Sequence, residues 1–176
     1  MDNFHKIGEG AVVNQLLAAI MRQPELWDQN NLRTTHPGTA HGQVNDIWLF
    51  FNEQGGDVVN DKMVVPYPAW DKLPQARPLI FDLMHFVQGV QLGRVIITKL
   101  GPGKKIAPHV DGGAPAEYYT RYQIALQSLP GSLFRIDDET VQFNSGDIWM
   151  IDNRKEHEVI NNSDDDRVVM IVDIRS

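Results

Sequence analysis

The second half of the sequence is a series of short runs rich in β-branched and aromatic residues, separated by turn signals. Six of these runs are predicted to be strands: 94–100, 121–129, 132–136, 147–151, 157–161 and 167–174. Glycine, proline, asparagine or aspartate lies between most successive runs. Many short strands with turns at this spacing are typical of a β-sandwich or an antiparallel barrel, so this half limits the chain to one of those architectures.

The first half of the sequence carries helix signals instead. Two helices and one strand are predicted there: 11–21, 79–87 and 47–51. Pro24 disfavours a continuation of the first helix. At this length we expect one domain over residues 1–176. Residues 1–93 would give helical support and the first strands, and residues 94–176 the metal-binding barrel core.

Composition restricts the kinds of site and partner. The chain has no cysteine, which excludes zinc–thiolate sites and iron–sulfur clusters, so histidine and carboxylate must hold any metal. Its net charge is −7, and its Lys and Arg residues form no cluster, so no nucleic-acid partner is expected. Neither a signal-like N-terminus nor an apolar run of ~20 residues is present, so we expect a cytoplasmic protein without membrane contact. The oligomeric state is not predicted.

The most distinctive local pattern is His109-Val110-Asp111, which is followed by two glycines. In an extended segment, side chains at i and i+2 point the same way, so His109 and Asp111 can bind one ion together. His157 opens a later predicted strand and could supply a third ligand on the same side of an iron. Taken alone, the first pair equally fits a turn histidine beside a capping aspartate, and His157 a strand-edge residue.

Arg167 lies ten residues after His157, beyond a turn. If strands 157–161 and 167–174 form a hairpin, Arg167 returns opposite His157, and its guanidinium can meet a carboxylate near the metal. The dicarboxylate 2-oxoglutarate fits that arrangement, since it chelates iron at one end and extends the other. A solvated charge balancing the acidic residues 164–166 is the alternative for Arg167.

The predicted strand that starts at Arg121 has two different faces. Arg121, Gln123 and Ala125 share one face, and Tyr122, Ile124 and Leu126 share the other. A polar face opposite an apolar one suits a strand that lines a wet pocket. In the alternative reading, Arg121 points to solvent.

These pieces together resemble the aspartyl/asparaginyl β-hydroxylase family of iron(II)- and 2-oxoglutarate-dependent oxygenases. The matching stretches are TKLGPGKKIAPH (98–109), RYQIAL (121–126), GD (146–147) with HEV (157–159), and the stretch 167–173. The spacings also match: His-x-Asp, a histidine and an arginine ten apart, and a hydroxyl residue eleven before the first histidine. The resemblance covers a little under half of the chain.

By resemblance, His109, Asp111 and His157 correspond to the metal ligands. Arg167 corresponds to the arginine that pairs with the far carboxylate of 2-oxoglutarate, and Thr98 to its hydroxyl helper. Two further residues, Arg121 and Gln123, resemble polar groups that hold cosubstrate or substrate. The family implies a mainly β fold with helices, namely a double-stranded β-helix (a jelly-roll, cupin-like barrel) preceded by helices.

The resemblance predicts a dioxygenase that uses iron(II), 2-oxoglutarate and oxygen. Its expected reaction is hydroxylation of an sp3 carbon of an amino acid or of a peptide or protein side chain. Segment 112–120 is longer than the family's usual connection, and we expect it to shape substrate choice and to hold the substrate together with Arg121. Two alternatives stay open: a cupin-type isomerase or dioxygenase that does not use 2-oxoglutarate, and a non-catalytic barrel that only binds.

Four other residues are expected to be structural. His36 and His41 lie in a turn-rich segment and are predicted at the surface. His85 lies in an apolar helix and is predicted to be a core histidine. Trp149 is expected to pack inside the barrel.

Overall fold

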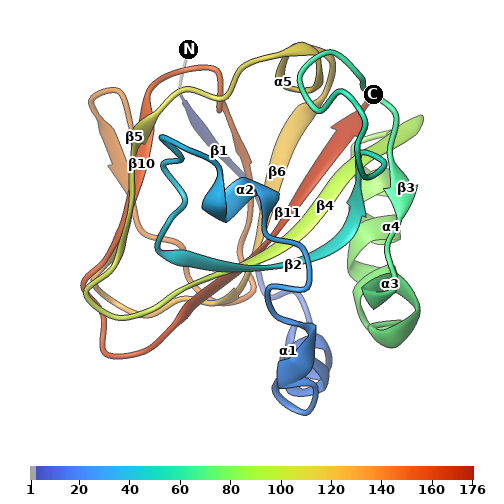
Figure 1. The fold of residues 1–176 in the computed structure, drawn as a ribbon. Helices are drawn as coiled ribbons and strands as arrows, with labels where there is room; N and C mark the ends of the chain where they lie inside the picture. The colour runs from blue at the N-terminus through green and yellow to red at the C-terminus, as the bar shows by residue number, and fades with distance from the viewer. Residues whose placement is uncertain (1–2) are drawn as a thin grey trace.

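The computed structural model describes residues 3–176 and contains two antiparallel sheets (Figure 1). The seven-stranded sheet has the order β1 (Phe4–Gly8), β9 (Ile148–Ile151), β6 (Thr120–Gln127), β11 (Arg167–Arg175), β4 (Gln91–Leu100), β2 (Val44–Phe51), β3 (Val65–Pro66). The four-stranded sheet has the order β5 (Lys105–His109), β10 (His157–Asn161), β7 (Ser132–Ile136), β8 (Glu139–Val141). This mainly β architecture with some helices confirms the predicted fold class.

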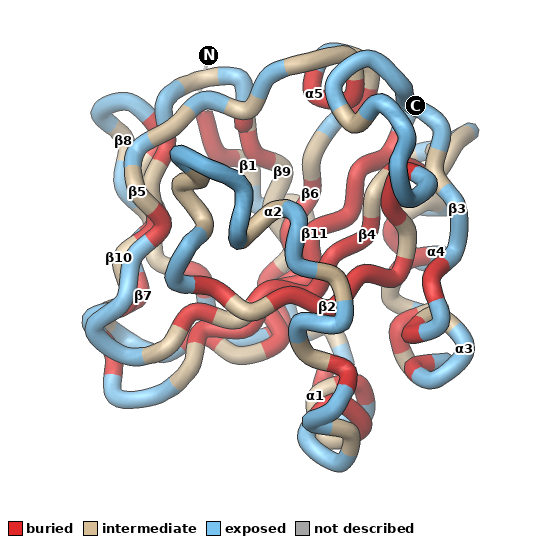
Figure 2. The backbone as a smooth tube through the Cα atoms, in the orientation of Figure 1, coloured by how far each residue is buried: buried red, intermediate tan, exposed pale blue. Residues whose placement is uncertain are grey.

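Helices cover the outer face of the large sheet. They are α1 (Asn14–Met21), α3 (Ala69–Lys72) and α4 (Ala76–Phe86), with a 3-10 turn η1 (Pro24–Leu26) after α1. Their apolar residues form one buried cluster with the outward side chains of β6 and β11. Figure 2 shows that most of these two strands is buried. Burial of this apolar area against the sheet is the main source of stability expected for such a layer.

A second apolar cluster fills the space between the two sheets. Phe134 and Val159 of the small sheet pack there with Ala125 of β6. Phe143 stacks on Trp149 with ring centroids 5.0 Å apart, so the predicted packing role of Trp149 is confirmed. Phe134 and Val159 of this cluster also line a small cavity between the sheets.

The strand predictions agree with the structure to within a few residues. Strands 132–136 and 157–161 match β7 and β10, and the other predicted strands differ only at their ends. The sequence did not predict β1, β3, β5 and β8. All four are short, and polar residues interrupt the apolar pattern of β1, β5 and β8. Both helix predictions are confirmed, with α4 starting three residues earlier than expected.

One topological prediction was wrong. Strands β10 and β11 do not form a hairpin, because β10 pairs with β5 and β7 whereas β11 pairs with β4 and β6. The turn between them crosses from the small sheet to the large one. Asn161 holds this crossing, since its side-chain amide donates to the carbonyl groups of Leu100 and Asp165 at 2.8 and 2.9 Å.

The first half of the chain contributes to the same large sheet as the second. Strand β1 pairs with β9, and β2 pairs with β4. Two short helices lie in connecting segments, α2 (Leu32–Thr35) and α5 (Ala114–Tyr118). Within residues 3–176, none of the helices has the length and apolar character needed to cross a membrane.

Candidate metal centre

The predicted metal residues converge at the edge of the small sheet. His109 ends β5 and is the register partner of His157, which begins β10. Asp111 follows two residues after His109, and its Oδ1 lies 3.4 Å from His109 Nε2. One nitrogen or oxygen from each of the three residues lies within 4.8 Å of the others, so the cluster could hold one metal ion.

Both imidazole rings are oriented by the backbone. His109 Nδ1 lies 2.8 Å from the carbonyl oxygen of Ala107, and His157 Nδ1 lies 2.8 Å from that of Lys155. A carbonyl oxygen only accepts, so each Nδ1 carries the proton and each Nε2 keeps its lone pair for a ligand. The Nε2 of His109 is buried and has no hydrogen-bond partner among the described residues. Burial also lowers the pKa of His157, which favours the neutral ring that metals bind.

Asp111 is held by two neighbours. Asn153 donates to its Oδ2 at 2.9 Å, and Arg121 donates to the same oxygen through Nη1. Arg121 is itself fixed by Asp173, which accepts from Nε and Nη2 at 2.8 Å each. Burial raises the pKa of Asp111, but the charge of Arg121, together with His109, His157 and Asn153, outweighs it and holds this pKa well below its usual range. The carboxylate is therefore ionised and oriented before any ligand binds.

Arg167 differs from Arg121 in having no carboxylate partner. It begins β11, is 2% exposed, and donates from Nη2 to Gln123 Oε1 at 3.2 Å. Its guanidinium lies 5.6 Å from the ring centroids of both Phe134 and Phe143. Among residues 3–176, no carboxylate oxygen comes within 4.0 Å of it. Burial lowers the pKa of Arg167 to about 10. A buried cation with only neutral partners can bind an anionic ligand.

A family model described as aspartyl/asparaginyl beta-hydroxylase matches residues 17–176. The chain belongs to this family. The match confirms the predicted resemblance and the predicted enzyme class, a hydroxylase. A comparison with curated protein sequences finds no significant match.

Solved structures share the fold of this hydroxylase at low sequence identity. An oxidoreductase of the 2OG-Fe(II) oxygenase family from Burkholderia pseudomallei is 12% identical, with a TM-score of 0.66 over 98% of this chain and 85% of that one. A prolyl hydroxylase from Trichoplax adhaerens, bound to a hypoxia-inducible factor peptide, is 10% identical, with a TM-score of 0.66 over 99% and 84%.

A viral collagen prolyl hydroxylase from Paramecium Bursaria Chlorella virus-1, solved as a 2-oxoglutarate complex, is 12% identical, with a TM-score of 0.56 over 99% and 97%. At these identities the likeness shows the fold. The cofactors predicted from the sequence are those named for these structures, and the donor set of the His–Asp–His cluster fits them.

Two further residues of the hydroxylase lie at this centre. The sequence did not predict a role for Arg33, and it placed His41 at the surface. Arg33 donates to Asp46 through Nε at 2.8 Å and to Thr98 Oγ1 through Nη2 at 3.3 Å. His41 lies against His109, with ring centroids 4.6 Å apart, so its predicted surface position was wrong. Burial, together with the charge of Arg33, lowers the pKa of His41 to about 2. No sequence pattern marked either residue, because both lie in a turn-rich segment.

Two other histidines are both exposed. His36 is at the surface, as predicted. His85 is exposed as well, so its predicted core position was wrong. The apolar face of α4 is formed by Ala76, Ile80 and Leu83, and His85 lies off that face near the end of the helix.

Two cavities meet at the His–Asp–His cluster. The inner one has a volume of about 30 Å³ and brings together all seven predicted site residues: Thr98, His109, Asp111, Arg121, Gln123, His157 and Arg167. The outer one has a volume of about 180 Å³ and shares Asp111 and Arg121 with the inner one. The inner space is about large enough for one water molecule, so a larger ligand requires side chains to move.

Proposed function

We propose that this protein is an iron(II)- and 2-oxoglutarate-dependent dioxygenase that hydroxylates an sp3 carbon of an amino acid or of a peptide side chain. The observation that carries the proposal is Arg167, a buried cation without a carboxylate partner in the same cavity as the histidine and aspartate ligands. A cupin-type isomerase or a binding barrel gives no reason for this uncompensated charge, whereas a dicarboxylate cosubstrate does.

In this proposal, His109, Asp111 and His157 hold the iron, and Arg167 pairs with the far carboxylate of 2-oxoglutarate. When bound, iron, 2-oxoglutarate and oxygen supply the oxidation: 2-oxoglutarate loses carbon dioxide and becomes succinate, and one oxygen atom enters a C–H bond of the substrate. The chain's own contribution is to orient the ligands, neutralise the cosubstrate's charge and limit access of water.

Thr98 and Gln123 support the cosubstrate side. Gln123 already accepts from Arg167 at 3.2 Å and so fixes the plane of its guanidinium. Thr98 is 3% exposed and lines the same cavity. A hydroxyl group can donate to a carboxylate oxygen that Arg167 also binds.

Arg121 takes a different role from the one first expected. Its guanidinium is paired with two carboxylates, Asp111 and Asp173, so little of its charge is left for a substrate. We assign it as a positioning residue, which holds Asp111 toward the metal. Outer-shell partners of this kind orient metal ligands and tune their basicity.

Segment 112–120, which follows Asp111, forms one rim of the outer cavity. Gly112, Pro115 and Ala116 line that cavity, and the backbone amide of Ala114 donates to the carbonyl of Val59 at 2.8 Å. Gly113 adopts a φ of +85°, and a Cβ there would lie 2.6 Å from the same carbonyl oxygen. The rim is therefore built from two loops in close backbone contact, and we propose that it selects the substrate.

The test is turnover with defined components. Purified protein, iron(II) and 2-oxoglutarate in oxygenated buffer are expected to form succinate slowly, because the reaction is uncoupled without substrate. A matching amino acid or peptide is expected to accelerate succinate formation and to gain one oxygen atom, measured by mass spectrometry. Omission of iron or of 2-oxoglutarate serves as the control. Succinate formation that does not depend on iron, or a stimulating compound with no amino-acid part, contradicts the proposal.

A further inference from the structure

The outer cavity contains a second arginine without a carboxylate partner. Arg94 lies on β4, and its side chain shares the inner face with Ile96 and Thr98 because residues two apart on a strand point the same way. Arg94 and Ile96 line the outer cavity, whereas Thr98 lines the inner one. The strand thus leads from the cosubstrate side to the proposed substrate side.

The two unpaired arginines are far apart along the sheet. Arg167 is the register partner of Leu100, which lies six residues along β4 from Arg94. At the rise of an extended strand, this separation is roughly 20 Å. One small ligand at the metal therefore does not pair with both guanidinium groups, and the half-buried Arg94 is left for a second anion.

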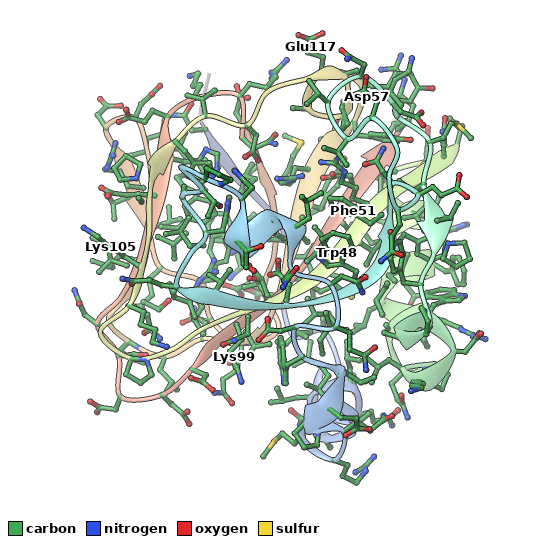
Figure 3. All side chains as sticks on the ribbon, viewed as in Figure 1. Trp48, Phe51, Asp57, Lys99, Lys105 and Glu117 are labelled. Atoms are coloured by element: carbon green, nitrogen blue, oxygen red, sulfur yellow. The ribbon has the colours of Figure 1, made fainter. Side chains whose placement is uncertain are left out.

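Arg94 is held in place by neutral groups. Its Nε donates to Asn52 Oδ1 at 2.9 Å, and its Nη2 donates to the carbonyl oxygen of Val58 at 2.6 Å. The guanidinium lies over the ring of Phe51, 4.3 Å from the centroid, and Phe51 stacks on Trp48 (Figure 3). Among residues 3–176, no carboxylate oxygen lies within 4.0 Å of it.

The balance of charge around the two cavities points the same way. Arg33 pairs with Asp46, and Arg121 pairs with Asp111 and Asp173. The charges of an iron(II) ion and of a 2-oxoglutarate dianion cancel each other. Four arginines then face three carboxylates, so one positive charge is left that an anionic group can neutralise. Arg94 is the arginine that borders the outer cavity without a carboxylate partner.

We propose that Arg94 binds a carboxylate of the substrate, so that the enzyme selects a substrate that carries an anion at this point. This inference rests on the proposed function and gives it a charge requirement. The carboxylate can be the α-carboxylate of a free amino acid or the side-chain carboxylate of an acidic residue in a peptide. Bidentate pairing makes a guanidinium well suited to such a group.

The experiment compares matched acids and amides. Protein loaded with manganese(II) in place of iron, with saturating 2-oxoglutarate, is titrated by calorimetry with the common amino acids and with their primary amides. A second arm uses end-capped tripeptides with a central Asp or Glu against the same peptides with Asn or Gln. At least one acid is expected to bind about tenfold more tightly than its amide, because a charge-assisted pair is lost in the amide.

Arg94→Gln is expected to reduce this acid preference to less than about threefold, and Arg94→Lys to keep part of it. If Arg94 only anchors Val58 and Asn52, loss of the anchor weakens acid and amide alike and leaves their ratio unchanged. The control is Arg135→Gln, which removes an arginine that pairs with Glu156 and Glu158 outside both cavities, and it is expected to keep the wild-type ratio.

Any of three results overturns the inference. In the first, the wild-type protein binds no acid, in either arm, more tightly than the matching amide. In the other two, Arg94→Gln keeps the wild-type preference for acids, or Arg94→Lys loses it as fully as Arg94→Gln does. Binding of 2-oxoglutarate, measured in the same samples, separates the two levels of the account. If 2-oxoglutarate binds but the acid preference does not depend on Arg94, only this inference fails. If 2-oxoglutarate does not bind, the proposed function fails, and this inference fails with it.

Discussion

Strands β6 and β11 have an apolar outward face and a partly polar inward face, and the two faces have different roles. The outward side chains belong to the main buried cluster under the helices: Tyr122, Ile124, Leu126, Val168, Met170 and Val172. The inward side chains are polar or charged at both ends: Arg121, Gln123, Arg167 and Asp173. One face therefore stabilises the fold and the other face presents chemistry. Substitutions on the two faces are expected to separate stability from activity.

The inner face itself contains two unlike ends. At one end, Arg121 is matched by the carboxylates of Asp111 and Asp173, so its charge is used within the protein. At the other end, Arg167 has only a neutral hydrogen-bond partner, Gln123. Paired charges orient other groups, whereas an unpaired buried charge is available to a ligand.

Loss of a metal ligand is expected to have the largest effect. His157→Ala removes one of three donors, so metal affinity should fall by more than the roughly 100-fold that outer-shell changes reach, and turnover should be lost. Metal content after dialysis and succinate formation measure this. The melting temperature is the control for folding. A variant that still binds iron as tightly as the wild type rules out His157 as a ligand.

A cavity in the outer face is expected to give the next largest effect, on stability alone. Ile124 is fully buried in the main cluster, so Ile124→Ala should lower the free energy of unfolding by about 2–5 kcal/mol. Val90→Ala, at a side chain that is 78% exposed, is the control and should stay within about 0.5 kcal/mol. Urea unfolding measures both. If the folded Ile124→Ala protein binds 2-oxoglutarate much more weakly, the two faces are not independent.

A smaller effect is expected at the paired end of the inner face. Asp173→Asn keeps the shape of the side chain but removes the charge that holds Arg121, so Asp111 is less well oriented. Metal affinity should fall by about 10- to 100-fold, the usual range for outer-shell partners. Asp71→Asn, which disturbs only the exposed pair with Arg77, should leave metal affinity unchanged. Equal metal affinities for the two variants argue against the positioning role.

The smallest of these effects is expected at Thr98. Thr98→Val keeps the volume but removes one hydroxyl group beside Arg33. If the hydroxyl donates to 2-oxoglutarate, the dissociation constant for 2-oxoglutarate should rise by no more than about tenfold, the value of one hydrogen bond. Binding calorimetry with manganese(II) measures it. An unchanged constant removes Thr98 from the cosubstrate site without affecting the assignment of Arg167.

The sequence predicted the strands, and a set of residues that line one cavity, better than it predicted the connections between strands. Alternation along β6 was enough to separate Arg121 and Gln123 from the apolar face. The turn after β10 looked like a hairpin because sequence spacing does not distinguish a return to the same sheet from a crossing to the other one. The structure brings Arg167 into the same cavity as His157 by the second route.

Long-range partners were beyond what local patterns can indicate. Arg33 and His41 reach the centre from a segment with turn signals and no periodicity, and their roles depend on contacts with Thr98 and His109 far along the chain. Arg94 was read only as the start of a strand. Its proposed role in substrate binding depends on the lack of a carboxylate partner among the described residues, which only the three-dimensional packing reveals.

The most direct measurement of the central claim compares two ligands on two proteins. 2-Oxopentanoate matches 2-oxoglutarate except that a methyl group replaces the far carboxylate. With manganese(II) bound, the wild-type protein should bind 2-oxoglutarate at least about tenfold more tightly, because Arg167 pairs with that carboxylate. In Arg167→Gln the two dissociation constants should come within about threefold of each other. A variant that keeps the wild-type preference for 2-oxoglutarate would show that Arg167 is not its anchor and would contradict the account.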